Sequence, residues 1–231
     1  MVSLINKDIH TRRIAWEIIK KATKKNKRLS DVSNDIFIKN TNNLNSDDKR
    51  FITMITQGTI RLKKRLDLEI ERAFIGDYER LKENLRILLR IGVYQLHYMD
   101  NVPDYAAVSS TVKLAKSIHP KLGGLANAVL RKLTTLNKLK KPSHKSSITN
   151  ISNYLSHPEW LINKWIKDMS FADAMSLAEW NNKIPNLWFR VNKAQYTLEK
   201  FKKYLNDNNI KFNQFKHIPE FIQSENHQEL I

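Results

Sequence analysis

Basic side chains are the residues of this sequence with an evident binding chemistry, and they are concentrated in particular stretches. Residues 105–158 contain no acidic residue, while nine basic residues accumulate there: Lys113, Lys116, Lys121, Arg131, Lys132, Lys138, Lys140, Lys141 and Lys145. A second basic cluster covers residues 20–28. An arginine guanidinium can hold a phosphate through two parallel hydrogen bonds, and a lysine ammonium acts as a point charge. A surface with charge of one sign favours a polyanionic partner.

Four groups of side chains are candidates to contact the phosphates or bases of a nucleic acid. They are Arg12, Arg13, Lys20, Lys21, Lys24, Lys25, Lys27 and Arg28; Arg61 and Lys64; Arg131 and Lys132; and Arg190 and Asn192. Each group has a structural alternative. The first three groups can equally be solvated helix surface, and acidic residues follow the second group closely. Arg190 and Asn192 can equally belong to the end of a strand.

The sequence lacks the residues that thiol chemistry, metal binding and nucleotide or S-adenosylmethionine binding require. The sequence has no cysteine, which excludes a thiolate nucleophile, a disulfide and a cysteine-based zinc site. The histidines show no HxxxH or comparable metal-ligand spacing. None of the five glycines forms GxGxxG or GxxxxGK[ST], the loops with which a backbone approaches a nucleotide or S-adenosylmethionine. We therefore expect no metal and no cofactor in this chain.

The overall composition is that of a folded, strongly basic protein. The 231 residues carry a formal net charge of +17, and a hydrophobic content of 41% is enough for a packed core. No apolar run approaches the roughly 20 residues that span a bilayer, and residues 1–16 do not resemble a secretory signal. We expect a cytoplasmic protein without a membrane partner.

Helical periodicity dominates the first 140 residues. Apolar residues at helical spacing predict helices over 6–25, 29–37, 47–74, 78–99, 103–118 and 122–136. Gly92, in the middle of one apolar stripe, costs roughly 1 kcal/mol against alanine and predicts a close approach of two helices. These elements predict an all-α bundle over residues 1–140, with the basic clusters on its surface.

The pattern of residues changes after residue 140. A polar, basic segment with a proline at Pro142 leads into short helices, so residues 141–182 are predicted to be linker helices. Pro158 fits a helix start, Ser170 with Asp173 resembles a capping box, and Trp160 and Trp165 are expected in the core. Strands are expected over 187–192 and 210–215, with a helix between them that Thr197 caps. This order of elements predicts an incomplete α/β, RRM-like subdomain over residues 183–231.

Several stretches carry a family resemblance. RRIAWEII (12–19), DKRFITMITQGTIRLKKRLD (48–67), LRILLRIGVYQLHYMDNVPDYAAV (85–108) and LANAVLRKL (125–133) resemble the NusB-like RNA-binding domain, a helical bundle. SHPEWLINKWIKDM (156–169) and LWFRVNKAQYTLEKFKKYL (187–205) resemble the linker and N-terminal subdomain of the Sun/RsmB family. Members of that family are S-adenosylmethionine-dependent cytosine-C5 methyltransferases of small-subunit rRNA.

The resemblance implies an RNA-targeting region without its catalytic domain. In the family, the cofactor loop and two catalytic cysteines follow the region where this sequence ends, so we expect the chain alone to be inactive, with S-adenosylmethionine bound by a missing or separate domain. The expected partner is RNA, specifically small-subunit rRNA. Two alternatives stay open: a NusB-type antitermination factor that regulates DNA-templated transcription, and a helical module that binds proteins.

Overall fold

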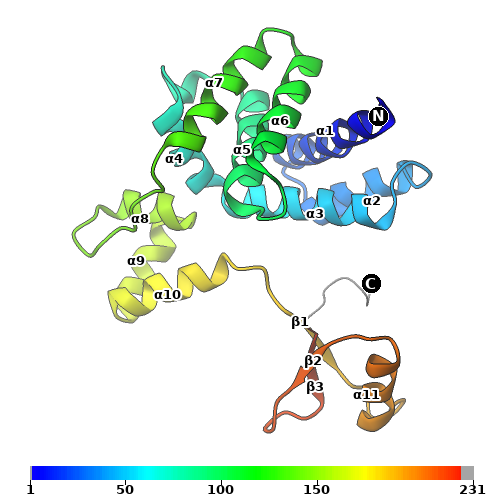
Figure 1. The fold of residues 1–231 in the computed structure, drawn as a ribbon. Helices are drawn as coiled ribbons and strands as arrows, with labels where there is room; N and C mark the ends of the chain where they lie inside the picture. The colour runs from blue at the N-terminus through cyan, green and yellow to red at the C-terminus, as the bar shows by residue number, and fades with distance from the viewer. Residues whose placement is uncertain (1, 225–231) are drawn as a thin grey trace. The chain divides into compact units, whose positions relative to one another are not determined.

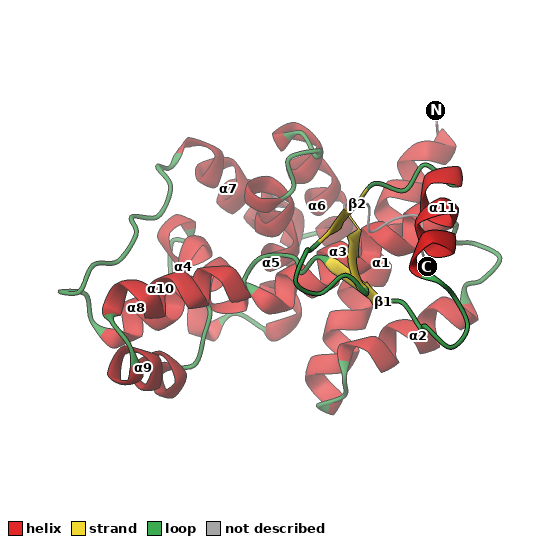
Figure 2. Cartoon of the chain, turned by 90° about the horizontal axis from the view of Figure 1, so that it is seen from below, coloured by secondary structure: helices red, strands yellow, loops and turns green. Residues whose placement is uncertain are grey.

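The structure is a computed structural model, and it describes residues 2–224. Helices make up most of this range, and its strands all lie after residue 186 (Figures 1 and 2). The chain divides into two compact units, one ending at Asn182 and the other beginning at Lys183. The expected fold, a helical bundle followed by a small α/β part, is confirmed.

A bundle of helices opens the first unit. Its elements are α1 (Val2–Lys25), α2 (Leu29–Lys39), α3 (Ser46–Arg61), α4 (Lys63–Ala73), the 3₁₀ turn η1 (Tyr78–Arg80), α5 (Glu83–Tyr98), α6 (Asp104–Ile118) and α7 (Leu122–Thr135). The amphipathic stripes of these helices converge on one core that extends from α1 to α7. The periodicity of the sequence located these helices within a few residues, except over 47–74.

Helix α5 is the centre of the bundle. It packs against α1, α3, α4, α6 and α7, and its residues are buried on every side from Ile87 to Gln95. A helix that is buried all round must approach its neighbours closely. At Gly92 an added Cβ would lie only 2.9 Å from Thr111 Cγ2 of α6 and 3.0 Å from the Leu130 methyl carbons of α7. The close approach expected at Gly92 is therefore present.

The helix predicted over 47–74 is two helices. Asn45 and Asp48 form a capping box that starts α3, and Leu62 separates α3 from α4 with φ −97° and ψ 17°. The backbone N–H of Lys64, in the first turn of α4, donates to Ser156 Oγ at 3.1 Å. The hydrogen bond comes from a residue 92 positions away. A local pattern cannot reveal a break that such a distant partner satisfies.

Three short helices complete the first unit: α8 (Ile148–Leu155), α9 (Glu159–Asp168) and α10 (Phe171–Asn181). They share a small core built from Ile151, Leu155, Ile162, Met175 and Ala178, and α8 packs on α4. The segment 141–182, predicted as linker helices, is thus helical from Ile148 onward and belongs to the same compact unit as the bundle.

The ends of these helices lie where the sequence predicted them, but one tryptophan predicted in the core is exposed. Ser170 Oγ accepts a hydrogen bond from the Asp173 N–H, as expected for a cap, and Pro158 immediately precedes α9. Trp165 packs against the small core. The core position expected for Trp160 is wrong, because its side chain is 67% exposed. The five-residue spacing of the two tryptophans turns them to different faces of α9.

The second unit is a three-stranded antiparallel sheet with one helix. Its elements are β1 (Leu187–Arg190), α11 (Leu198–Asp207), β2 (Phe212–Gln214) and β3 (Phe221–Ser224), with strand order β1-β3-β2. Thr197 caps α11, as expected. The central strand β3 was not predicted, because a four-residue segment with two polar side chains carries little local signal. It pairs with both other strands and thereby completes the sheet.

Candidate nucleic-acid interface

The α6–α7 hairpin presents an exposed surface without acidic side chains beyond its first turn. Lys113, Lys116, Lys121, Arg131 and Lys132 are all exposed. Among the side chains that the structure describes, those of residues 9–224, no ion pair involves these five cations, whereas Lys141 in the following segment contacts Glu179 at 2.6 Å. The hairpin therefore carries a positive field that no local carboxylate neutralises.

Arg13 adds a cation from another helix to this surface. Its Nη2 donates to Ser117 Oγ at 2.8 Å, which joins α1 to the last turn of α6. Lys116 directly precedes Ser117, and its aliphatic stem lies over Gly123, where an added Cβ would be 2.4 Å from Lys116 Cγ. The sequence shows these charges, but only the packing of α1 on α6 brings Arg13 to the lysines of the hairpin turn.

The predicted cluster at the end of α1 is largely solvent-exposed. The exposed members are Lys21, Lys24, Lys25, Lys27 and Arg28. Lys20 is half-buried and places its ammonium 4.6 Å from the centre of the Trp16 ring. Lys24 and Lys25 occupy the last turn, where the helix dipole favours cations. Both a phosphate contact and a solvated helix end agree with this exposure.

Arg12 occupies a different environment from its neighbour Arg13. Its side chain is only 4% exposed, Nε donates to Gln95 Oε1 at 2.6 Å, and the guanidinium lies 4.9 Å from the centre of the Phe51 ring. These contacts give Arg12 a structural role, joining α1 to α3 and α5, in place of the phosphate contact expected from the sequence. The signal was present: Arg12 shares a helix face with buried Trp16 and Ile19.

Lys64 is also engaged within the fold. Its Nζ donates to Ser152 Oγ at 2.8 Å and to the His157 carbonyl at 3.2 Å. Together with its backbone bond to Ser156, this side chain connects α4 to the α8–α9 junction instead of pointing to a ligand. Arg61 is half-buried at the end of α3, and its charge acts on the Tyr94 phenol, whose pKa burial raises.

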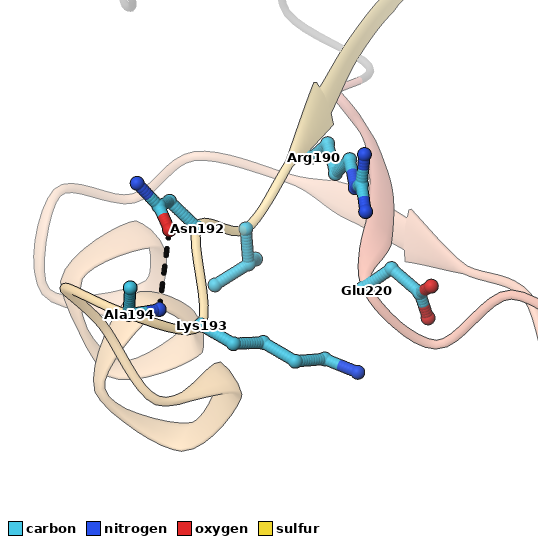
Figure 3. A pocket seen from close by; sticks show the side chains of 6 residues that line it. Arg190, Asn192, Lys193, Ala194 and Glu220 are labelled. Atoms are coloured by element: carbon cyan, nitrogen blue, oxygen red, sulfur yellow. Dashed lines mark hydrogen bonds between the residues drawn. The ribbon is translucent and has the colours of Figure 1, made fainter.

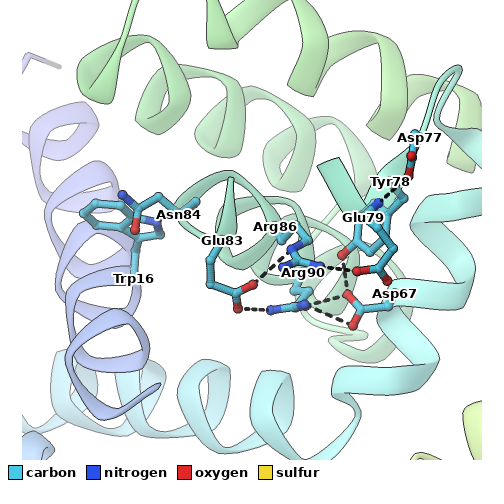
Figure 4. Close-up of polar contacts among 9 residues, drawn as sticks. All are labelled: Trp16, Asp67, Asp77, Tyr78, Glu79, Glu83, Asn84, Arg86 and Arg90. Carbon is cyan, nitrogen blue, oxygen red and sulfur yellow. Dashed lines mark hydrogen bonds and ion pairs between the residues drawn. The ribbon is translucent and has the colours of Figure 1, made fainter. Parts of the chain in front are cut away.

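A buried ion network fixes α4 against α5 (Figure 4). Arg90 is bidentate on Asp67, with distances of 2.6 and 3.0 Å, and its Nη1 donates to Glu83 at 2.7 Å. The Tyr78 hydroxyl also donates to Asp67. Burial opposes the charge of Arg90, but the hydrogen bond and charge of Asp67 raise its pKa. The network is consistent with a structural function, because its charges are satisfied internally.

A second polar cluster connects the bundle to α8. Glu69, on α4, is buried and accepts hydrogen bonds from the Tyr98 hydroxyl at 2.6 Å and contacts His97 Nδ1, both on α5. Arg65 lies above two rings, 5.6 Å from the centre of Tyr98 and 4.2 Å from that of Tyr154 on α8. Burial raises the pKa of Tyr98, so its hydroxyl stays protonated as a donor.

In the second unit, Arg190 and Asn192 border a depression of about 430 Å³ (Figure 3). Its lining is Arg190, Val191, Asn192, Lys193, Ala194 and Glu220. Asn192 Oδ1 accepts a hydrogen bond from the Ala194 N–H at 3.1 Å, which closes an Asx turn after β1. Asn192 thus shapes the loop, while Arg190 and Lys193 supply positive charge at its rim.

The described side chains, those of residues 9–224, contain no group of three or more His, Cys, Asp or Glu that could hold a metal ion. Every helix in the same range is too short or too polar to cross a lipid bilayer.

A comparison with protein families decides the classification of the bundle. The model of the NusB family matches residues 10–135, which is the region of α1 to α7. The chain belongs to the NusB family. A second model, the ferredoxin-like domain of RsmF/B-like methyltransferases, matches residues 157–229 of this NusB-family chain. That match begins within the first compact unit, at the α8–α9 junction, and extends through the sheet unit.

The chain is similar to part of several curated proteins. The chain is 32% identical over 152 residues to a probable ribosomal RNA small subunit methyltransferase B of Synechocystis. It is 28% identical over 156 residues to the Bacillus subtilis protein of the same description, and 26% identical over 204 residues to that of Klebsiella pneumoniae. These alignments cover 64%, 67% and 88% of the chain, but only 34%, 35% and 45% of the relatives. The chain therefore corresponds to their N-terminal part.

A solved structure shows the same fold. The crystal structure of PH0851 superposes with a TM-score of 0.59 at 19% identity, covering 95% of this chain and 48% of PH0851. The resemblance predicted from the sequence, a NusB-like bundle followed by the beginning of a methyltransferase-associated subdomain, is confirmed.

Proposed function

We propose that this chain binds structured small-subunit rRNA, as the RNA-recognition region of a cytosine-C5 methyltransferase. The observation that carries the proposal is the acid-free surface of the α6–α7 hairpin, which lies inside the NusB family match. The relatives' description as small-subunit rRNA methyltransferases supports the choice of RNA. Such a function would place the chain in the cytoplasm.

Binding would be driven by phosphate neutralisation. Each phosphate that a lysine or arginine contacts releases counterions, so the logarithm of the affinity falls by about 0.7–0.9 per contact for each tenfold increase in salt. Exposed cations of the hairpin, Arg13 and the cluster at the end of α1 would supply these contacts. Folded RNA would be recognised mainly through its shape and loops, because side chains cannot read the deep major groove of an RNA duplex.

Methyl transfer itself would require residues outside this chain. S-adenosylmethionine would bind the catalytic domain, since none of the five glycines here belongs to a cofactor loop and no cysteine is present to attack the base. An antitermination role, the first alternative, is disfavoured by the match of residues 157–229 to a methyltransferase-associated domain. The protein-docking alternative is distinguished by the experiment below.

The test is binding of the full chain to a small-subunit rRNA fragment across a salt series. One variant combines Arg131→Ala with Lys132→Ala, and its matched control combines Lys164→Ala with Lys167→Ala on exposed α9. The first variant should lower the affinity for RNA and reduce the slope of its salt dependence by the amount expected for one to two phosphate contacts. The control should leave the affinity and the slope unchanged. An affinity independent of salt, or absent at low salt, would refute RNA binding and leave protein docking.

A further inference from the structure

The sheet of the second unit has one covered face and one open face within the described residues. Helix α11 covers the face that carries Phe189, Ile222 and Phe212, and the Phe189 and Phe201 rings lie 6.4 Å apart across that contact. Ile222 is fully buried there. Because side chains alternate along a strand, the neighbouring residues of β1, β2 and β3 must face the other way.

The open face is defined by the strand register. Trp188 pairs with Gln223, and Gln223 pairs with Asn213 on β2, so these three side chains share the face. Arg190 pairs with Phe221 and lies on the same side. The open face is thus a row of aromatic, amide and guanidinium groups: Trp188, Arg190, Asn213, Phe221 and Gln223.

Two large rings are exposed together on this face. Trp188 is 44% exposed and Phe215, directly after β2, is 41% exposed. Their rings are stacked, with centroids 5.1 Å apart and an angle of 29° between the ring planes. The Arg190 guanidinium lies 5.9 Å from the centre of the Phe221 ring. The sheet therefore holds two flat rings side by side, and each ring remains partly open to solvent.

The charge of the unit indicates the kind of partner. Residues 183–224 contain eight basic and three acidic residues, a formal net charge of +5. Lysine is depleted at protein–protein interfaces, whereas seven of the eight basic residues of this unit are lysines. Arg190 also borders the depression with Lys193, so positive charge continues from the face to the β1–α11 loop. Aromatic rings beside cations fit unpaired nucleotides.

We propose that this open sheet face binds unpaired RNA bases by stacking them on Trp188 and Phe215. Arg190 and Lys193 would hold the adjoining phosphates, and the Gln223 amide would bond to base edges. The inference rests on the proposed RNA-binding function and adds a second, single-strand site to it. The bundle would then contact folded rRNA by charge, and the sheet would hold an unpaired segment of the same molecule.

The experiment measures the affinity of the full chain for an unpaired RNA of about 12 nucleotides and for the same RNA in a duplex. Trp188→Ala should weaken single-strand binding by about 5- to 150-fold, which is the loss of affinity expected when one base no longer stacks on an aromatic ring. It should leave duplex binding unchanged. The salt dependence should not change, because no cation is removed. Trp160→Ala, which removes another exposed tryptophan, is the matched control and should bind like the wild type.

Two conservative variants keep the test decisive if the alanine variant loses its fold. Trp188→Phe retains a ring and should bind within about threefold of the wild type, whereas Trp188→Leu should bind as weakly as a variant without stacking. Equal single-strand affinities of these two variants would overturn the inference, and the face would then be a protein-docking surface. The proposed function would survive that result if the wild type still binds the rRNA fragment with a steep salt dependence. Absence of any RNA binding would refute both.

Discussion

Arg12 and Arg13 are adjacent in sequence and identical in charge, yet the structure predicts opposite effects when each is replaced by alanine. Arg12 is buried between helices, and Arg13 is half-buried beside the α6–α7 hairpin. Arg12→Ala should destabilise the fold with little direct effect on RNA contacts. Arg13→Ala should leave the fold nearly intact and weaken RNA binding.

The magnitude follows from the contacts. Arg12→Ala removes a charge-assisted hydrogen bond to fully buried Gln95, which contributes about 1.5–3 kcal/mol, and a desolvated cation–π contact with Phe51 worth about 2 kcal/mol. The free energy of unfolding should therefore fall by about 3–5 kcal/mol. Arg13→Ala removes one exposed hydrogen bond to Ser117, so the loss should stay below about 1 kcal/mol.

Two assays separate the arginines. Urea unfolding followed by circular dichroism gives the free energy of unfolding, and RNA binding across a salt series gives the number of phosphate contacts. Arg13→Ala should reduce the slope of the logarithm of affinity against the logarithm of salt concentration by about 0.7–0.9. Arg12→Ala should not change this slope at temperatures where the variant is folded. Arg12→Met, which keeps the packing of the stem, should recover part of the lost stability.

One result would refute this reasoning. If Arg12→Ala loses less than about 1 kcal/mol of stability and flattens the salt dependence as much as Arg13→Ala, then Arg12 reaches a phosphate in solution. The buried position and its role as a connector between α1, α3 and α5 would then be incorrect.

Three further perturbations test the packing. Gly58→Ala should destabilise the wild type, because its Cβ would lie 1.9 Å from Tyr94 Cζ, but should stabilise a Tyr94→Leu background by up to about 1 kcal/mol through helix propensity; thermal melting of the four proteins gives both signs. Asp67→Ala should cost about 3–5 kcal/mol in denaturant unfolding, because it leaves buried Arg90 with Glu83 as its remaining carboxylate partner, and Asp67→Leu with Arg90→Met should cost less. Burial opposes the charge of Glu83, but the hydrogen bond and charge of Arg90 hold its pKa below the usual value, so Glu83→Gln should be less stable than the wild type at pH 7, and the difference should shrink as the pH falls through the range in which carboxyl groups are protonated.

Each of these has a contrary outcome. A Gly58→Ala variant as stable as the wild type would mean that Tyr94 moves without cost. Equal losses for the single and the double replacement would mean that the lost pairing of Arg90 with Asp67 is not the source of the instability. A stability difference at Glu83 that does not change between pH 7 and pH 3 would show that its ionisation is not coupled to folding.

Helix positions and class were predictable because the apolar periodicity of the bundle is strong and local. The same periodicity located α1 and α5 to α7 and the covered faces of each, and the capping signals at Ser170 and Thr197 were correct. These features depend on neighbours within a few positions along the chain.

The features that the sequence did not predict depend on contacts between residues far apart in the chain. The break at Leu62 depends on Ser156, and the central strand β3 exists because β1 and β2 lie on both sides of it. Arg12 and Lys64 look like other cations in the sequence, and their engagement within the fold depends on Gln95 and on Ser152. Trp160 has an apolar side chain but no helix packs over it.

The sequence by itself determined the helical class, the basic character and the absence of cysteine and glycine-loop chemistry, because these are properties of composition and of local spacing. The tertiary structure alone decided which cations are exposed, that Arg13 joins the hairpin of α6 and α7, and that Trp188 and Phe215 stack on an open sheet face. Charge and ring are properties of a residue, whereas availability to a ligand depends on what packs over it, and packing is set by contacts between segments far apart in the chain.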